Sequence, residues 1–271
     1  ESGRPLTHYP NHLDNQFGAH SFQCLVNGSI GFRVTDHLDQ TEAVGHAVRA
    51  CYMYSAMADV AALTGDQAYV DAISRIWENV VSKKYYITGG IGQAGYNEGF
   101  GDDYYLPNLE AYCKTCASIA MVFWNHRLFL MKGDARYLDV LERTLYNAAV
   151  DGVALSGDLF FYPNPLASDG RHHRRPWFGC ACCPSNICRF LPSMPGYIYS
   201  YRENEIFVNL YVSSEAFVET GKNRINIGQE SQYPWNGNIS ITVDPQQSGR
   251  FTLSLRIPGW ARNEPVPGEL Y

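Results

Sequence analysis

The chain has 271 residues, of which 45% are hydrophobic and 14% aromatic, and a formal net charge of −6. Its aromatic content excludes a disordered chain, and its acidic balance argues against a nucleic-acid partner, because phosphates are bound by basic surfaces. No apolar stretch reaches the length of a membrane span, so we expect a folded globular protein with neither a nucleic-acid nor a membrane partner.

Apolar residues recur at helical spacing through much of the first 150 residues. Gly65 follows the first of these stretches as a C-terminal stop. Asn108 is placed to cap a later helix that would contain both Cys113 and Cys116. The sequence predicts helices at residues 42–63, 66–82, 108–132 and 135–150.

After Tyr201 the pattern changes to short alternating stretches that are separated by proline and glycine. These stretches predict strands at residues 206–211, 224–227, 239–243 and 251–257. We therefore expect two parts. They are a helical part at residues 1–200, in which residues 1–41 are unassigned, and an antiparallel β-sandwich at residues 201–271.

A glycine-rich loop and two polar residues are candidates for a functional site. The loop at residues 89–92 lacks the spacing and the Lys-Ser/Thr pair of a P-loop, so a tight turn that brings the backbone close to a ligand is the better interpretation. Phe100 would desolvate Glu98 and raise its pKa toward the range of a general acid, although an acidic loop residue is more often solvated surface. His46 is equally compatible with a core histidine and with a pocket.

The eight cysteines are crowded together more than they are spread along the chain. Disulfide frameworks distribute cysteines over small domains that lack a core, whereas crowding favours a metal site or a reactive thiolate. A helix carrying Cys113 and Cys116 and a loop carrying Cys182 and Cys183 would bring thiolates together, and zinc suits such ligands. The alternative for an isolated cysteine is a buried small apolar residue, and it applies to Cys24, Cys51 and Cys113.

Six phrases of the sequence stand out, namely Glu42–Ala50, Gly89–Gly92, Thr115–Ser118, Phe161–Leu166, Trp177–Pro184 and Leu255–Trp260. Together and in this order they resemble the β-L-arabinofuranosidases of glycoside hydrolase family 127 and its close relative, family 146. The resemblance implies a catalytic (α/α)6 barrel followed by a β-sandwich. Such a barrel has twelve helices, far more than are predicted before the strands begin, so we expect a partial chain with an incomplete barrel.

The resemblance also implies an activity and the residues that perform it. The activity is that of a retaining hydrolase, which releases terminal β-L-arabinofuranose from plant-derived glycans through a zinc-bound cysteine nucleophile. Cys182 stands at the position of the nucleophile and Glu98 at that of the acid/base. His46 and Tyr162 match residues that contact the sugar. The implied zinc ligands include three cysteines, Cys116, Cys182 and Cys183.

Lys114 departs from the family pattern, which has a zinc-binding glutamate at this position. A cation cannot replace an anionic ligand, so three arrangements are open. Three thiolates and a water bind zinc, Glu110 reaches the metal from one helical turn earlier, or no zinc binds and Lys114 stabilises the Cys182 thiolate. The substitution is also compatible with an intact fold and an inactive enzyme.

Three alternative functions fit parts of the same pattern. The first is an L-arabinopyranosidase with the same machinery, and the second is a non-catalytic homologue with a structural zinc site. The third is a carbohydrate-binding module built on Tyr233, Trp235 and Trp260, although these rings would also suit the core of a sandwich. Thiol-bound zinc suits the reducing cytoplasm. No signal peptide is recognisable in the sequence, but one that has already been removed would permit the periplasm.

Overall fold

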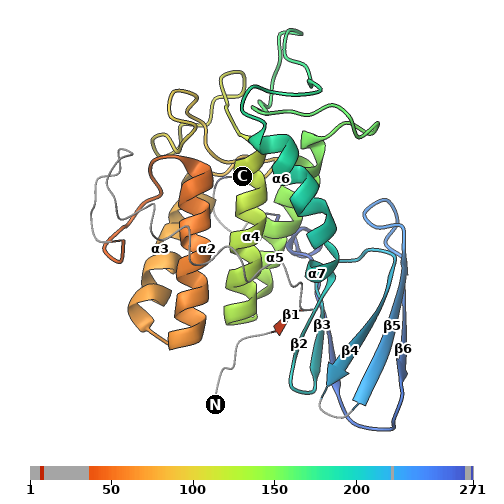
Figure 1. Ribbon diagram of the computed structural model, residues 1–271. Coiled ribbons are helices and arrows are strands. Elements are labelled where there is room, and N and C mark those ends of the chain that lie inside the picture. The colour runs from red at the N-terminus through yellow and green to blue at the C-terminus, as the bar shows by residue number, and fades with distance from the viewer. Residues whose placement is uncertain (1–6, 9–36, 221–222, 266–269, 271) are drawn as a thin grey trace.

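The computed structural model describes residues 7–8, 37–220, 223–265 and 270. Apart from the short strand β1 (Thr7–His8), a helical region comes first along the chain and strands follow it (Figure 1). No described helix combines the length and the apolar character needed to cross a membrane. The helices are α2 (Ala47–Thr64), α3 (Gln67–Lys83), α4 (Thr115–Lys132), α5 (Ala135–Thr144), α6 (Cys182–Phe190) and α7 (Pro195–Ile198).

The helices α2 and α3 confirm the first two predicted helices to within a few residues. Gly65 ends α2 in the left-handed conformation, with a φ of 70°, and its N–H donates to the carbonyl of Ala61. The side chain of Asp66 then caps α3 by accepting a hydrogen bond of 2.9 Å from the N–H of Ala68. A tight turn thus joins two neighbouring helices.

The helix α4 begins later than the sequence predicts. It starts at Thr115, so Asn108 is not its N-cap, and Cys113 lies before the helix with a φ of 39°. Side chains on nearly every side of α4 are buried, because α2, α5 and α6 pack around it (Figure 1). A helix that is apolar all round is expected at such a central position.

The end of α5 is irregular where the sequence predicts a continuous helix. A π-helical turn (Leu145–Ala149) and a 3₁₀ turn (Val150–Gly152) follow it. The glycine-rich loop packs here, because a Cβ on Gly89, whose φ is 89°, would lie only 2.6 Å from the Cα of Thr144. The loop is therefore a tight turn, as predicted, and Gly89 allows its close approach to the end of α5.

The N-terminal ends of α2, α4 and α6 lie at one end of the helical region (Figure 1). Two long connections, residues 84–114 and 153–181, gather over the same end (Figure 1). This arrangement follows from the up-and-down course of the chain. It brings together helix ends that are far apart in the sequence.

The strands form two sheets, with the orders β1-β2-β3-β7 and β4-β5-β6. The strands β2 and β4 were not predicted, and β3 and β7 pair in parallel, so the region is not wholly antiparallel. The sheets share an apolar core, to which Ile206 contributes from one sheet and Ile225 from the other. The bounds are β2 (Tyr199–Arg202), β3 (Glu205–Val208), β4 (Ser214–Thr220), β5 (Asn223–Ser231), β6 (Ile239–Pro245) and β7 (Thr252–Leu255).

A buried arginine connects the strands to α5. Arg256 is only 5% exposed, and its Nη1 and Nη2 lie 2.7 Å from Asp139 Oδ1 and 2.5 Å from Glu142 Oε1. Its Nε donates to the carbonyl of Asn209 at 2.6 Å. Because each charge has a partner, this buried ionic group fixes the sheets against the helical region.

Candidate active site

Glu98 lies in a tight turn at the end where the helices converge. The turn is closed by two hydrogen bonds of 3.0 Å between the backbones of Ala94 and Gly99, and Glu98 itself has a positive φ of 51°. The carbonyl of Glu98 accepts a hydrogen bond of 3.1 Å from the N–H of Ala47, at the beginning of α2. The turn is thereby held against α2, and an unusual backbone conformation of this kind is common at functional sites.

Four side chains surround the carboxylate of Glu98. On Oε1, the hydroxyl of Tyr112 donates at 2.9 Å and that of Tyr162 at 3.3 Å. On Oε2, His46 Nε2 lies at 3.0 Å and Lys114 Nζ donates a hydrogen bond. Lys114 is 5% exposed, so its ammonium is held inside the site and its charge is shielded from water.

These contacts determine the protonation of the resting site. Burial alone would raise the pKa of Glu98, but hydrogen bonds from Lys114 and Tyr112, with the charge of Lys114, lower it below its ordinary value. Burial and the charge of Lys114 lower the pKa of His46. The prediction that Phe100 raises the pKa of Glu98 is therefore wrong, although Phe100 is buried.

Three sulfur atoms form a second group at the same end, which we call the sulfur cluster. Cys116 lies in the first turn of α4, and Cys182 and Cys183 begin α6. Their Sγ atoms all lie within 4.8 Å of one another, and those of Cys182 and Cys183 are 4.0 Å apart. The sequence predicted a loop at Cys182 and Cys183. In the structure they lie on α6, a helix that was not predicted.

The remaining described cysteines lie outside the sulfur cluster. Cys113 is buried beside Tyr86 and Ala111, and Cys51 is buried in the main core, as expected of small apolar side chains. No disulfide joins the described cysteines. Cys24 lies outside the described residues.

The thiols of the sulfur cluster are electrostatically unequal. Hydrogen bonds from Cys116 and Cys183 lower the pKa of Cys182, and the Lys114 charge acts in the same direction against burial. The hydrogen bond with Cys182 raises the pKa of Cys116 to about 11. Cys182 is therefore the thiol that ionises most readily.

Tyr162 lies between the two groups. Its hydroxyl is 3.3 Å from the Sγ of Cys182 and also 3.3 Å from Oε1 of Glu98. Its ring packs against Phe178, with 5.4 Å between ring centroids, and the ammonium of Lys114 lies 4.3 Å from the ring centroid. The most acidic thiol and the partly exposed carboxylate of Glu98 thus lie on either side of one hydroxyl group.

The sulfur cluster suits a zinc ion in ligand type and spacing. With Zn–S bonds of about 2.3 Å, tetrahedral geometry places sulfur atoms roughly 3.8 Å apart, close to the spacing of these thiols. No carboxylate belongs to the cluster among the described residues. Glu110 is exposed and precedes α4, and Lys114 donates to Glu98, so neither supplies the fourth ligand.

Tyr112 is a site residue that the sequence did not reveal. Residues 111–114 are not helical, and Tyr112 and Lys114 both reach Glu98 while Cys113 between them packs elsewhere. Cys113 has a φ of 39°, so the segment is neither helical nor regularly extended. The helix predicted over residues 108–132 gave no reason to pair Tyr112 with Lys114.

Comparison with protein families gives two matches along the chain. The model of the GH127 catalytic domain of β-L-arabinofuranosidases matches residues 33–196. The model of the GH127 middle domain matches residues 205–267. A curated protein of Bifidobacterium longum subsp. longum, named non-reducing end β-L-arabinofuranosidase, is 38% identical over 240 residues, which cover 83% of this chain and 36% of that protein.

Solved structures give the same result. A GH127 β-arabinofuranosidase is 58% identical and has a TM-score of 0.84, with 86% of this chain and 37% of that chain covered. A GH127 β-L-arabinofuranosidase from Geobacillus stearothermophilus T6 is 46% identical and has a TM-score of 0.80, with 83% and 37% covered. The chain spans little more than a third of the length of these relatives. It belongs to the GH127 β-L-arabinofuranosidase family.

Proposed function

We propose that this site belongs to a retaining glycoside hydrolase that releases terminal β-L-arabinofuranose from plant-derived glycans. The observation that carries the proposal is the position of Cys182 and Glu98 on either side of the Tyr162 hydroxyl. Two contacts of 3.3 Å in series place the sulfur and the carboxylate at most about 6.6 Å apart, a limit that includes the roughly 5–5.5 Å between the two carboxyl groups of retaining enzymes. The choice of sugar rests on the names of the relatives.

In the first half of the reaction, Cys182 is the nucleophile. Its sulfur bonds to the anomeric carbon while the bond from that carbon to the glycosidic oxygen breaks, and Glu98 gives its proton to the departing oxygen. The low pKa of Cys182 favours the thiolate that this step needs. The low pKa of Glu98 makes its protonated form scarce, so we expect the step to slow as pH rises.

In the second half, Glu98 acts as the base. It removes a proton from water, whose oxygen attacks the anomeric carbon and displaces the Cys182 thiolate. The resting ionised state of Glu98 suits this role. His46 and Tyr162, which already contact Glu98, are placed to contact the sugar that enters between the two catalytic groups.

The metal ligands in this proposal are Cys116, Cys182 and Cys183. A zinc ion bound by them would stabilise the thiolate form of these side chains. Water is the remaining candidate for the fourth ligand, because Lys114 is bound to Glu98 and Glu110 is exposed.

The proposal also covers the architecture of the whole protein. We infer that the described helices belong to an incomplete (α/α)6 barrel at residues 1–200 and that residues 201–271 begin the β-sandwich region. The bounds of the two family matches support a division near residue 200. Most of the unassigned residues 1–41 lie outside the described residues.

Replacement of the nucleophile tests the proposal. We expect the C182S variant to lose turnover of an aryl β-L-arabinofuranoside, because an unactivated hydroxyl is a far weaker nucleophile than a thiolate. The matched control is C188S, which removes an exposed thiol from the same helix and should retain the activity of the parent chain. Equal activity of C182S and the parent chain would exclude Cys182 as the nucleophile.

A non-catalytic homologue with a structural zinc site is the second candidate. It is favoured by the ion pair of Lys114 with Glu98, which engages the carboxylate that would act as acid/base. Metal analysis of the purified chain beside the same kinetic assay separates the candidates. Stoichiometric zinc without turnover of the aryl arabinofuranoside would favour the structural role.

A further inference from the structure

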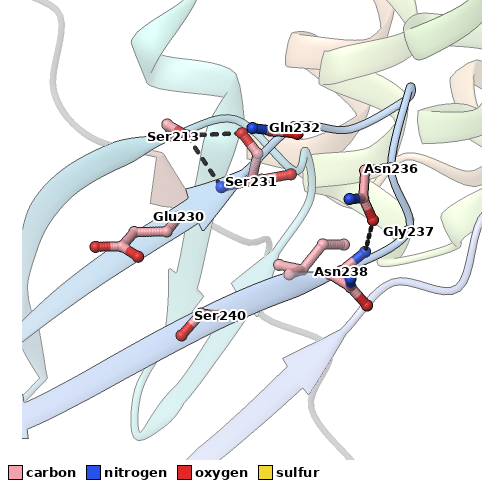
Figure 2. A pocket seen from close by; sticks show the side chains of 9 residues that line it. Ser213, Glu230, Ser231, Gln232, Asn236, Gly237, Asn238 and Ser240 are labelled. Carbon is pink, nitrogen blue, oxygen red and sulfur yellow. Dashed lines mark hydrogen bonds between the residues drawn. The ribbon is translucent and has the colours of Figure 1, made fainter.

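A polar groove lies on the second sheet, at the turn that joins β5 to β6 (Figure 2). Its volume is about 720 Å³, within the range of small-molecule sites. Glu230 and Ser240 are paired across the two strands, so their side chains lie on the same exposed face of the sheet. Gln232 and Asn238 continue the groove into the turn (Figure 2).

The groove offers polar groups that the protein itself does not use. Within the described part of the chain, the structure gives no hydrogen bond to the side chains of Glu230, Gln232, Asn238 or Ser240. Two amides, a carboxylate and a hydroxyl provide both donors and acceptors, and a single carboxylate is the only charged group that lines the groove. Such a set suits a neutral ligand with many hydroxyl groups.

The turn that joins β5 to β6 also carries an exposed indole. Trp235 lies in the sequence between Gln232 and Asn236, which line the groove, and its side chain is 93% exposed. It therefore does not pack in the core of the sheets, which was the alternative that the sequence left open for this ring. A large aromatic ring in water is available to stack on the C–H face of a sugar, as the polar groups bind its hydroxyls.

The turn that carries Trp235 is held in place from below. The hydroxyl of Tyr233 donates to Glu142 Oε2 at 3.1 Å, and Trp260 Nε1 donates to the hydroxyl of Tyr233 at 3.1 Å. Within the turn, the N–H of Trp235 donates to the carbonyl of Gln232 at 2.9 Å. These bonds fix the turn before any ligand arrives, which lowers the entropic cost of binding.

We propose that this groove is a second carbohydrate-binding site, separate from the sulfur cluster, which holds a neutral saccharide unit of the glycan chain. Trp235 stacks on the sugar ring, and Glu230, Gln232 and Asn238 bind its hydroxyls. The choice of an arabinose-containing glycan rests on the proposed function, but binding in the groove requires no catalysis.

Affinity electrophoresis of the intact chain in gels that contain soluble plant arabinan tests this site. We expect arabinan to retard the chain and W235A to weaken binding about tenfold or more, as loss of a central aromatic contact does. A second variant, G237L, fills the groove without removing a contact, because a Cβ on Gly237 meets no atom within 4 Å. The Q232A/N238A double variant tests the amides.

The controls separate this site from the catalytic one. Y105A removes an exposed aromatic side chain from the helical region and should bind arabinan like the parent chain. W235A should keep the parent activity toward a small aryl arabinofuranoside, and retardation is measured whether or not that activity exists. Unchanged arabinan binding by folded W235A and G237L, or no retardation of the folded parent chain, would overturn the proposal.

Discussion

The carboxylate of Glu98 contacts four neighbouring side chains, and these contacts determine the direction in which its pKa shifts. Two tyrosine hydroxyls, a histidine and a buried ammonium all stabilise the ionised form, and their sum exceeds the effect of burial. The sequence suggested the opposite shift, because it revealed an aromatic neighbour but not the donors. Among those donors, Lys114 carries a full positive charge that burial leaves poorly screened.

Removal of that charge should change the pH profile. In K114Q the ionised form of Glu98 loses its ammonium partner, so the pKa of Glu98 rises and its protonated form persists to higher pH. The proposed first half-reaction needs this protonated form. We therefore expect the descending limb of kcat/KM against pH, measured with an aryl arabinofuranoside, to move to higher pH in K114Q.

The control for this profile is K83Q, which removes an ammonium 2.8 Å from Asp103, outside the site. Its descending limb should coincide with that of the parent chain. A K114Q profile that also coincides with the parent would mean that Lys114 does not set the protonation of Glu98, the proposed catalytic acid.

Much of the site was predictable at the residue scale, and the exceptions have a physical cause. Crowding of thiols indicated Cys113, Cys116, Cys182 and Cys183, and the structure brings together the last three, which the family resemblance implied as ligands. Tyr112 was missed, and the partner of Lys114 was not foreseen. Both depend on contacts across the fold, which no local sequence pattern records.

At the scale of elements, prediction succeeded where amphipathic periodicity and end signals agree. The helices α2 and α3 have both, with Gly65 and Asp66 between them. The helix α4 ended at Gly133 as predicted, but its beginning was not marked, since Lys114 makes no side-chain cap. The helix α6 was missed because it is short and begins within the cysteine-rich phrase, where zinc chemistry suggested a loop.

The contact between α5 and the strands gives a prediction for stability. In R256M the carboxylates of Asp139 and Glu142 lose their cation in a buried setting, so we expect the free energy of unfolding to fall by about 3–5 kcal/mol. Chemical denaturation followed by circular dichroism measures this change. The loss would be large because the guanidinium also bonds to the backbone of Asn209.

A surface pair supplies the comparison. Arg202 and Glu205 form an ion pair in which both side chains are partly exposed, and R202M should cost no more than about 1 kcal/mol. Equal losses in R256M and R202M would show that the buried ionic group does not hold the sheets to the helical region.

The whole molecule brings the two halves of the proposed metal site from distant parts of the chain. Cys116 begins α4, and Cys182 and Cys183 begin α6 after the long connection of residues 153–181. A metal bound to all three would join these helices in the folded chain only. Sequence patterns indicated the ligands, but their convergence depends on the up-and-down course of the helices.

Zinc should therefore stabilise the folded chain, whether or not the chain is catalytically active. At a free zinc concentration of 100 times Kd the gain is about 2.7 kcal/mol, which corresponds to a rise in Tm on the order of 5–10 °C for a chain of this size. Thermal unfolding with zinc and with a chelator measures it. The rise should be lost in C116S and C183S and kept in C188S, whose exposed thiol lies outside the sulfur cluster. If C116S kept the full rise, zinc would be binding elsewhere, and the convergence of α4 and α6 would have to be explained by packing alone.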